Sequence, residues 1–174
     1  MTSPELPIDT RRLVLRGFER SDLAAVDAYH SLPEAQRYLD WKARDRSELE
    51  AGLNAMSTQR RLNRPGDTLS LAVVRKSDGV LLGQVSLRWT DATAGQAELR
   101  FVFNPTYRRQ GYATRGLALL LDQARAAGLA VVCLMVDEEN LASQRVIGRN
   151  GGVITHQVAP DYRGLTTVCY GIAL

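Results

Sequence analysis

The chain has 174 residues, of which 45% are hydrophobic and 24% charged, and its formal net charge is +3. This length and composition argue against intrinsic disorder and favour one domain over residues 1–174. The mild basic balance is weak support for a nucleic-acid-binding protein, because no cluster of Lys and Arg stands out, and a polyanionic small molecule explains it equally well.

The first half of the chain predicts a strand, two helices and an antiparallel meander of three strands. After a loose tail at residues 1–10, the predicted elements are a strand at 12–18, a helix at 21–32 capped by Ser21, a helix at 47–62 that begins with a capping box at residues 47–50, and strands at 68–76, 80–90 and 96–104.

The second half alternates helices with strands. The predicted elements are a helix at 114–127 with Leu117, Leu120, Leu121 and Ala124 on one face, an apolar strand at 129–136, a short helix at 141–149, and strands at 153–158 and 165–173. Gly128 stands where a C-terminal glycine ends a helix. The order predicts an α/β fold with a mixed sheet and helices on both sides.

Cysteines and histidines give little sign of special chemistry. Cys133 and Cys169 lie in apolar strand-like runs, so we expect free buried thiols, with a disulfide between them as the alternative. His30 and His156 have no metal-ligand spacing, and no metal is expected. No signal peptide precedes the first strand and no apolar run reaches membrane-spanning length, so a cytoplasmic location is expected.

One segment has the composition of an anion site, Arg108-Arg109-Gln110-Gly111-Tyr112-Ala113, which joins a predicted strand to a predicted helix. Amides at a helix start have no partner within the helix and carry partial positive charge, so they attract phosphates. Gly111 allows close approach of the backbone to a phosphate, and Arg108 and Arg109 add charge-assisted hydrogen bonds. The alternative is an ordinary helix start with two solvated arginines.

This segment and three others resemble the GNAT superfamily of acetyl-CoA-dependent N-acetyltransferases, in particular its RimJ/RimL-like branch. That family carries Arg/Gln-x-x-Gly-x-Gly/Ala after its fourth strand, as residues 108–113 do. Residues 97–105 (AELRFVFNP) resemble the fourth strand, residues 11–16 (RRLVLR) the first strand, and residues 140–146 (NLASQRV) the later Asn-x-x-Ser-x-Arg-Val signature. The resemblance runs along nearly the whole chain and implies the GNAT fold, a mixed, mostly antiparallel sheet of about seven strands with splayed fourth and fifth strands.

The resemblance implies that acetyl-CoA is the cosubstrate and lies between the splayed strands. Its pantetheine arm would pair with the backbone of the fourth strand, and its pyrophosphate would lie on the amides of the turn. The implied cofactor-binding residues are Phe101, Val102, Phe103, Arg108, Arg109, Gln110, Gly111, Tyr112, Ala113, Thr114, Asn140 and Ser143. Alternatively, Asn140 is a helix cap and Ser143 an ordinary polar helix residue.

Glu98 is the candidate base, because an alkylammonium ion has no lone pair and must lose a proton before it attacks. The alternative for Glu98 is a solvated carboxylate or an ion pair with Arg100. A backbone amide near Val102 or Phe103 would stabilise the oxyanion. Many family members have a tyrosine acid four residues after Ser143; this chain has Ile147, so Ser143 remains the candidate acid. Residues 148–152 also depart from the family's usual Glu-Lys-x-Gly-Phe.

The acceptor implied by the resemblance is a primary amine, either a protein N-terminus or a small molecule. Tyr38, Trp41, Trp89 and Tyr162 are candidates to line its pocket, with core or edge packing as the alternative. The last strands are candidates for homodimer pairing. The competing hypotheses are a catalytically degenerate CoA-binding domain with a sensing or regulatory role and a basic nucleic-acid-binding protein.

Overall fold

The computed structural model describes residues 5–36, 45–91, 93–161 and 164–174. Eight strands form one mixed sheet in the order β1-β2-β3-β4-β5-β6-β8-β7. The strands are β1 (Ile8–Asp9), β2 (Leu13–Arg16), β3 (Thr68–Arg75), β4 (Leu81–Asp91), β5 (Gln96–Phe103), β6 (Val131–Asp137), β7 (Val153–Val158) and β8 (Thr167–Ala173). The helices are α1 (Leu23–His30), α2 (Pro33–Gln36), α3 (Arg46–Thr58), α4 (Tyr112–Ala126) and α5 (Leu141–Arg149), with 3-10 turns η1 (Arg20–Asp22) and η2 (Pro105–Tyr107).

The predicted fold class and order of elements are confirmed, with corrections at the helix starts. The predicted tail contains β1, which raises the strand count from about seven to eight. Ser21 lies inside η1 and does not cap α1; its hydroxyl donates to the Glu19 carboxylate at 3.4 Å. The capping box of α3 is formed by Asp45 and Glu48 rather than from residue 47, because the Asp45 carboxylate accepts from the Glu48 amide at 2.9 Å.

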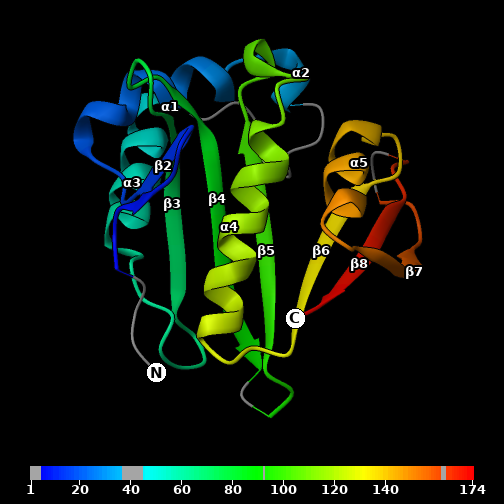
Figure 1. Cartoon of the computed structure of the whole chain (residues 1–174). Coiled ribbons are helices and arrows are strands. Elements are labelled where there is room, and N and C mark those ends of the chain that lie inside the picture. Colours follow the sequence, from blue (N-terminus) through cyan, green and yellow to red (C-terminus); the bar gives the residue numbers. More distant parts are fainter. Residues whose placement is uncertain (1–4, 37–44, 92, 162–163) are drawn as a thin grey trace.

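Apolar side chains pack on both faces of the sheet. In Figure 1, α4 lies in front of β4 and β5, while α1 and α3 lie behind the sheet. The predicted apolar face of α4 is fully used: Leu117, Leu120, Leu121 and Ala124 are all buried against the sheet. The second cluster holds Phe18, Val26, Tyr29 and Leu53 with residues of β3 and β4. The strands therefore have two distinct faces, an α4 face and an α1/α3 face.

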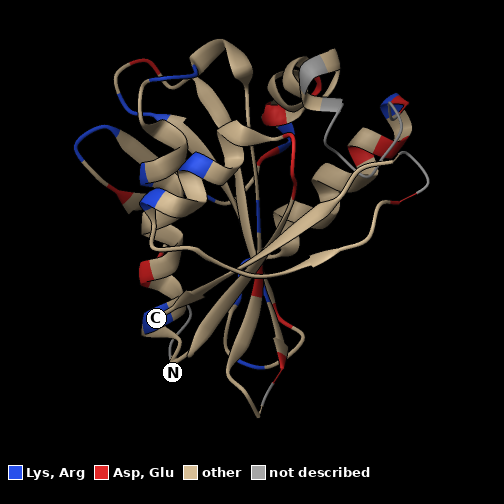
Figure 2. Ribbon diagram, turned by 90° about the vertical axis from the view of Figure 1, so that its right-hand side faces the viewer, with Lys and Arg blue, Asp and Glu red and all other residues tan. Residues whose placement is uncertain are grey.

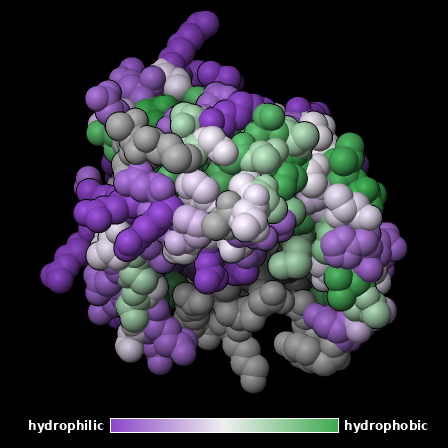
Figure 3. All heavy atoms as spheres, turned by 90° about the horizontal axis from the view of Figure 1, so that it is seen from below, coloured by the Kyte–Doolittle hydropathy of each residue, from purple (hydrophilic) through white to green (hydrophobic). Residues whose placement is uncertain are grey.

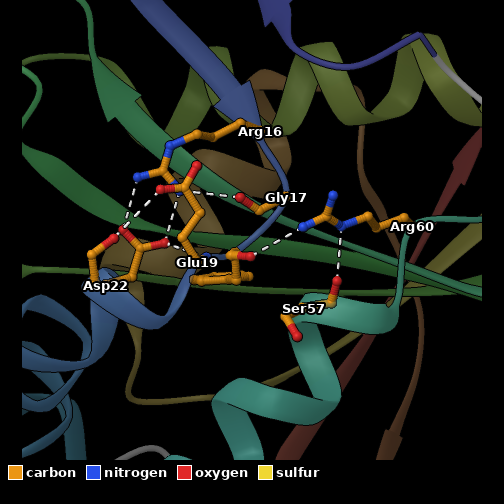
Figure 4. Close-up of polar contacts among 8 residues, drawn as sticks. Arg16, Gly17, Glu19, Asp22, Ser57 and Arg60 are labelled. Carbon is orange, nitrogen blue, oxygen red and sulfur yellow. Dashed lines mark hydrogen bonds and ion pairs between the residues drawn. The ribbon is translucent and has the colours of Figure 1, made fainter.

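A two-pronged ion pair fixes the entry into α1 (Figure 4). Nη1 and Nη2 of Arg16 donate to the two carboxylate oxygens of Asp22 at 2.7 and 2.8 Å, and Asp22 also accepts from the Glu19 amide. Arg60, just after α3, donates to the Phe18 carbonyl at 3.3 Å. These bonds attach the α1/α3 layer to the end of β2.

The strand β7, at one edge of the sheet, is exposed along its whole length, whereas β8 beside it is mostly buried. All six residues of β7 are exposed, and neither β7 nor β8 contains a charged residue, as Figure 2 shows. Seen from below in Figure 3, hydrophobic patches are separated by hydrophilic residues. No helix in the described part of the chain has the length and apolar composition of a membrane span.

The strands β5 and β6 pair over a short stretch and then diverge. They run parallel, and only Gln96–Glu98 pairs with Val131–Cys133. Beyond this point β5 continues beside β4 to Phe103, while β6 continues beside β8 to Asp137. We call the region between residues 99–103 of β5 and 134–137 of β6 the fork; it is the predicted splay of the fourth and fifth strands of the resemblance (Figure 1).

Candidate functional site

The turn at residues 108–111, here called the cradle, leads directly into α4. Gly111 is the N-cap of α4 and has a left-handed backbone, with φ 77° and ψ 5°. Arg109 also has a positive φ of 61°, a conformation that costs a non-glycine residue about 1 kcal/mol or more. Arg115 donates its amide to the Gly111 carbonyl at 3.0 Å, so this is the first helical hydrogen bond that follows the cap. The amides of Tyr112, Ala113 and Thr114 precede it and are the donors that a helix start offers to an anion.

Two cation–π contacts involve the tyrosines on either side of the cradle. The guanidinium of Arg12 lies 4.9 Å from the ring centre of Tyr112, and that of Arg75 lies 5.0 Å from the ring centre of Tyr107. Arg12 also reaches the Gln110 carbonyl at 3.4 Å. The Arg12 guanidinium, and after it that of Arg75, holds the pKa of the Tyr112 phenol below its ordinary value. Because the Tyr112 ring is buried, this residue offers the cradle its backbone amide rather than its side chain.

Helix α5 is capped by Asn140 and tied to α4 by Asn150. The Asn140 side-chain oxygen accepts from the Ser143 amide at 3.1 Å, so the helix-cap alternative describes what its side chain does in this structure. Asn150 donates to the Thr114 carbonyl at 3.3 Å and to the Val146 carbonyl at 2.9 Å. The altered ending of this helix therefore has a structural role that the sequence reasoning missed.

The backbone of β5 offers alternate groups to the fork. Asn104 donates its amide to the Leu82 carbonyl on β4 at 2.9 Å. Backbone direction alternates along a strand, so Val102 bonds to β4 as well, and Phe101 and Phe103 direct their N–H and C=O groups to the fork. The structure therefore favours Phe101 or Phe103 over Val102 as a partner for pantetheine or an oxyanion. Gly116 allows α4 to pack closely here, since a Cβ would lie 3.1 Å from the Phe103 ring.

Glu98 stands at the base of the fork, on the face of β5 that is turned away from α4. Its register partner on β6 is Cys133, and the pair is the last before the strands part. Nε of Arg100 donates to Oε1 of Glu98 at 2.7 Å, so the ion-pair alternative for Glu98 is present. This ion pair does not exclude a role of Glu98 as base, because an acceptor amine can take the place of Arg100 beside the carboxylate. Burial raises the pKa of the Cys133 thiol, and the charges of Cys169 and Glu98 raise it further.

Of the four candidates for the acceptor pocket, the structure describes Trp89 alone. Trp89 belongs to the core on the α4 face, and its Nε1 donates to the Asp91 carbonyl at 2.9 Å, so the pocket prediction is wrong for this residue. Ile147 is buried in the same core. Tyr38, Trp41 and Tyr162 lie outside the described residues.

The thiols and histidines show no metal chemistry. Both cysteines are free, as expected. His30 is buried with its Nε2 3.5 Å from Oε1 of Gln84. In the described ranges, no three His, Cys, Asp or Glu side chains gather as a metal ion would require.

The sequence pattern that defines the acetyltransferase (GNAT) domain matches residues 12–153. An uncharacterized N-acetyltransferase of Bacillus subtilis, YnaD, is 25% identical over 145 residues, which cover 83% of this chain and 81% of YnaD. Residues 12–153, which match the family pattern, include the cradle, the fork and α5.

Two solved structures show the same fold. A putative ribosomal-protein-serine acetyltransferase from Vibrio cholerae superimposes with a TM-score of 0.80 at 22% identity, covering 99% of this chain and 100% of the other. A spermidine N-acetyltransferase from Vibrio cholerae, solved with CoA and spermine, gives a TM-score of 0.78 at 19% identity, covering 94% of this chain and 96% of the other.

Proposed function

The chain belongs to the acetyltransferase (GNAT) domain family, and from this premise we propose that it transfers acetyl from acetyl-CoA to a primary amine by direct attack in a ternary complex. The observation that carries the proposal is the cradle beside the fork. A left-handed glycine cap with nothing within 4 Å of a Cβ position leaves the first amides of α4 open to a pyrophosphate. The diverging strands supply backbone groups for the pantetheine arm.

The reaction has three steps, and the described residues include a candidate group for each. Glu98 takes a proton from the ammonium group, directly or through water, and the neutral nitrogen attacks the thioester carbon. A backbone amide of Phe101 or Phe103 donates to the oxyanion of the tetrahedral intermediate. The C–S bond then breaks, and the departing thiolate takes a proton, for which Ser143 is the candidate donor. The balance is one ammonium and acetyl-CoA giving an acetamide, CoA thiol and one proton.

The acceptor class is drawn from the relatives. The RimJ/RimL-like motifs and the fold shared with a putative ribosomal-protein-serine acetyltransferase favour a protein N-terminus. The fold shared with an enzyme solved with spermine favours a small amine. Both are primary amines, so both fit the same attack on the thioester. We further propose that residues 1–174 act as one acetyltransferase domain.

Thiol release from acetyl-CoA, followed with a panel of peptides and small amines, tests the proposal. We expect turnover with at least one amine, and we expect Glu98→Gln to lower kcat by about 100-fold or more with little change in the affinity for CoA. Asp122→Asn is the control, because it removes another ion-paired carboxylate, on α4. CoA binding without thiol release on any amine would reject the proposal in favour of a sensing or regulatory domain. Full activity of Glu98→Gln across the pH range would remove Glu98 from the mechanism.

A further inference from the structure

Resting on the proposed function, we infer that the acceptor carries an anionic group, such as a carboxylate, on the carbon next to its amine. We assign Arg100 as the residue that binds this anion while the amine meets Glu98. The acceptor class that fits is therefore a free α-amino acid or a close analogue, rather than a polyamine or a peptide N-terminus.

Glu98 and Arg100 are two residues apart on β5, so their side chains leave the same face of the strand. That face carries Val102 under α1 at one end and Glu98 at the base of the fork at the other. Only 21% of the Glu98 side chain is exposed, whereas 70% of the Arg100 side chain is exposed. Arg100 thus presents a solvated cation beside the point where the amine must lose its proton.

The ion pair between Glu98 and Arg100 can be exchanged for contacts with a ligand at little cost in stability. An exposed ion pair contributes about 0–1 kcal/mol to stability, because water and salt screen it. An incoming zwitterion can replace it by two contacts of the same kind, ammonium to Glu98 and carboxylate to Arg100. Nε of Arg100 already lies 2.7 Å from Oε1 of Glu98. A ligand that bridges two groups in contact needs its own opposite charges only two or three bonds apart, as in an α-amino acid.

The charges on this face of β4 and β5 also favour an anionic acceptor. Arg88 on β4 is the register partner of Glu98, is exposed, and points to the same face. Ser86, the register partner of Arg100, is uncharged. On this face of β4 and β5 the two arginines outnumber the single carboxylate, an excess of positive charge that attracts a negative group on the acceptor. Spermine, the ligand of the Vibrio cholerae spermidine enzyme, carries only positive charges and would be repelled here.

Matched acceptors test the inference on the wild-type protein. Each of the twenty L-amino acids is compared with its α-carboxamide and with its decarboxylated amine, which share the side chain but lack the carboxylate. Thiol release gives kcat and KM for each compound at saturating acetyl-CoA. We expect kcat/KM for the best amino acid to exceed that of its amide and amine by about 10- to 100-fold, the effect of losing a charged hydrogen bond.

Variants then assign the preference to Arg100. Arg100→Gln should lower kcat/KM for the amino acid by about 10- to 100-fold relative to the amide, mainly through KM, while the KM for the amide and the KM for acetyl-CoA stay unchanged. Arg100→Lys should recover part of the loss, because it restores the charge without the fork geometry. Arg125→Gln is the control, since Arg125 is also an exposed arginine in an ion pair but lies on α4.

The outcomes separate this inference from the function on which it rests. Equal use of acid, amide and amine, a preference for peptides or spermidine, or an unchanged ratio in Arg100→Gln would overturn the inference and leave the acetyltransferase intact. An absence of thiol release with every amine would overturn the proposed function and the inference together. A preference for the acid that disappears in Arg100→Gln alone would establish the role of Arg100.

Discussion

Replacing Gly111 with alanine separates the two reasons for a glycine at the start of α4. Its backbone is left-handed, with φ 77°, and no atom lies within 4 Å of the position that a Cβ would take. The added methyl group therefore meets no protein atom, and the cost in the free protein is conformational. A non-glycine residue in this region costs about 1–2 kcal/mol. For a chain of this size, each 1 kcal/mol lowers Tm by about 2–4 °C.

Gly111→Ala should weaken the binding of CoA more than it lowers the free energy of unfolding. Alanine at this position favours a right-handed backbone, which would turn the amides of Tyr112 and Ala113 away from their present direction. The methyl group would also stand on the open side of the cradle, from which a phosphate approaches. A hydrogen bond to a charged group contributes about 1.5–3 kcal/mol, so the loss of one raises the Kd for CoA by about 10- to 100-fold.

Gly66 supplies the matched control. It has φ 92° and likewise nothing within 4 Å of its Cβ position, so Gly66→Ala has a similar conformational cost. Its amide pairs with the Trp89 carbonyl, whereas the cradle follows the end of β5 near Gly83, about 20 Å away along β4. Urea unfolding measures stability, and calorimetry measures CoA binding. If both variants bind CoA as the wild type does, or both lose affinity equally, the cradle does not bind the pyrophosphate through Gly111.

Two further predictions concern the base of the fork and the entry into α1. Burial raises the pKa of the Cys133 thiol and Glu98 raises it further, so alkylation of this thiol by iodoacetamide should be slow at pH 7 and become faster as the pH rises. Glu98→Gln should lower that pKa and accelerate the alkylation. Peptide mapping measures the rate, and an unchanged rate in the variant would contradict the electrostatic reasoning. Asp22→Asn should lower the free energy of unfolding, measured in urea, by about 2–4 kcal/mol, because it leaves the partly buried guanidinium of Arg16 without its carboxylate. Asp122→Asn breaks an exposed ion pair and should lower it by about 0–1 kcal/mol. Equal losses in the two variants would refute this distinction.

The sequence predicted best where the signal is local or periodic. The apolar face of α4, its C-terminal Gly128 and the bounds of α5 and β7 follow from side-chain spacing and turn residues, and the structure confirms them. The predicted start of α1 was wrong. Ser21 is a good local cap, but the ion pair between Arg16 at the end of β2 and Asp22 fixes the backbone there, and side-chain preference at a single position does not reveal it.

Contacts between distant segments carry no comparable signal. Arg12 stacks on Tyr112 across 100 residues of sequence, and Asn150 reaches Thr114 from the far end of α5. Trp89 was a candidate for the acceptor pocket with core packing as the alternative, because an aromatic residue offers both a packing surface and a recognition surface and the sequence alone does not decide between them. Its burial on the α4 face follows from the register of β4, which is a property of the whole sheet.

The bond from Asn150 to the Thr114 carbonyl bears on the unusual chemistry of α5. Ile147 faces the core, so the helix offers no tyrosine to the fork, and Ser143 at its first turn is the remaining hydroxyl donor. Ser143 gives its amide to Asn140, which leaves its hydroxyl as the part that a thiolate would meet. Asn150 attaches the end of this helix to the first turn of α4. The helix that carries the candidate proton donor is therefore hydrogen-bonded to the helix turn whose amides would bind the pyrophosphate.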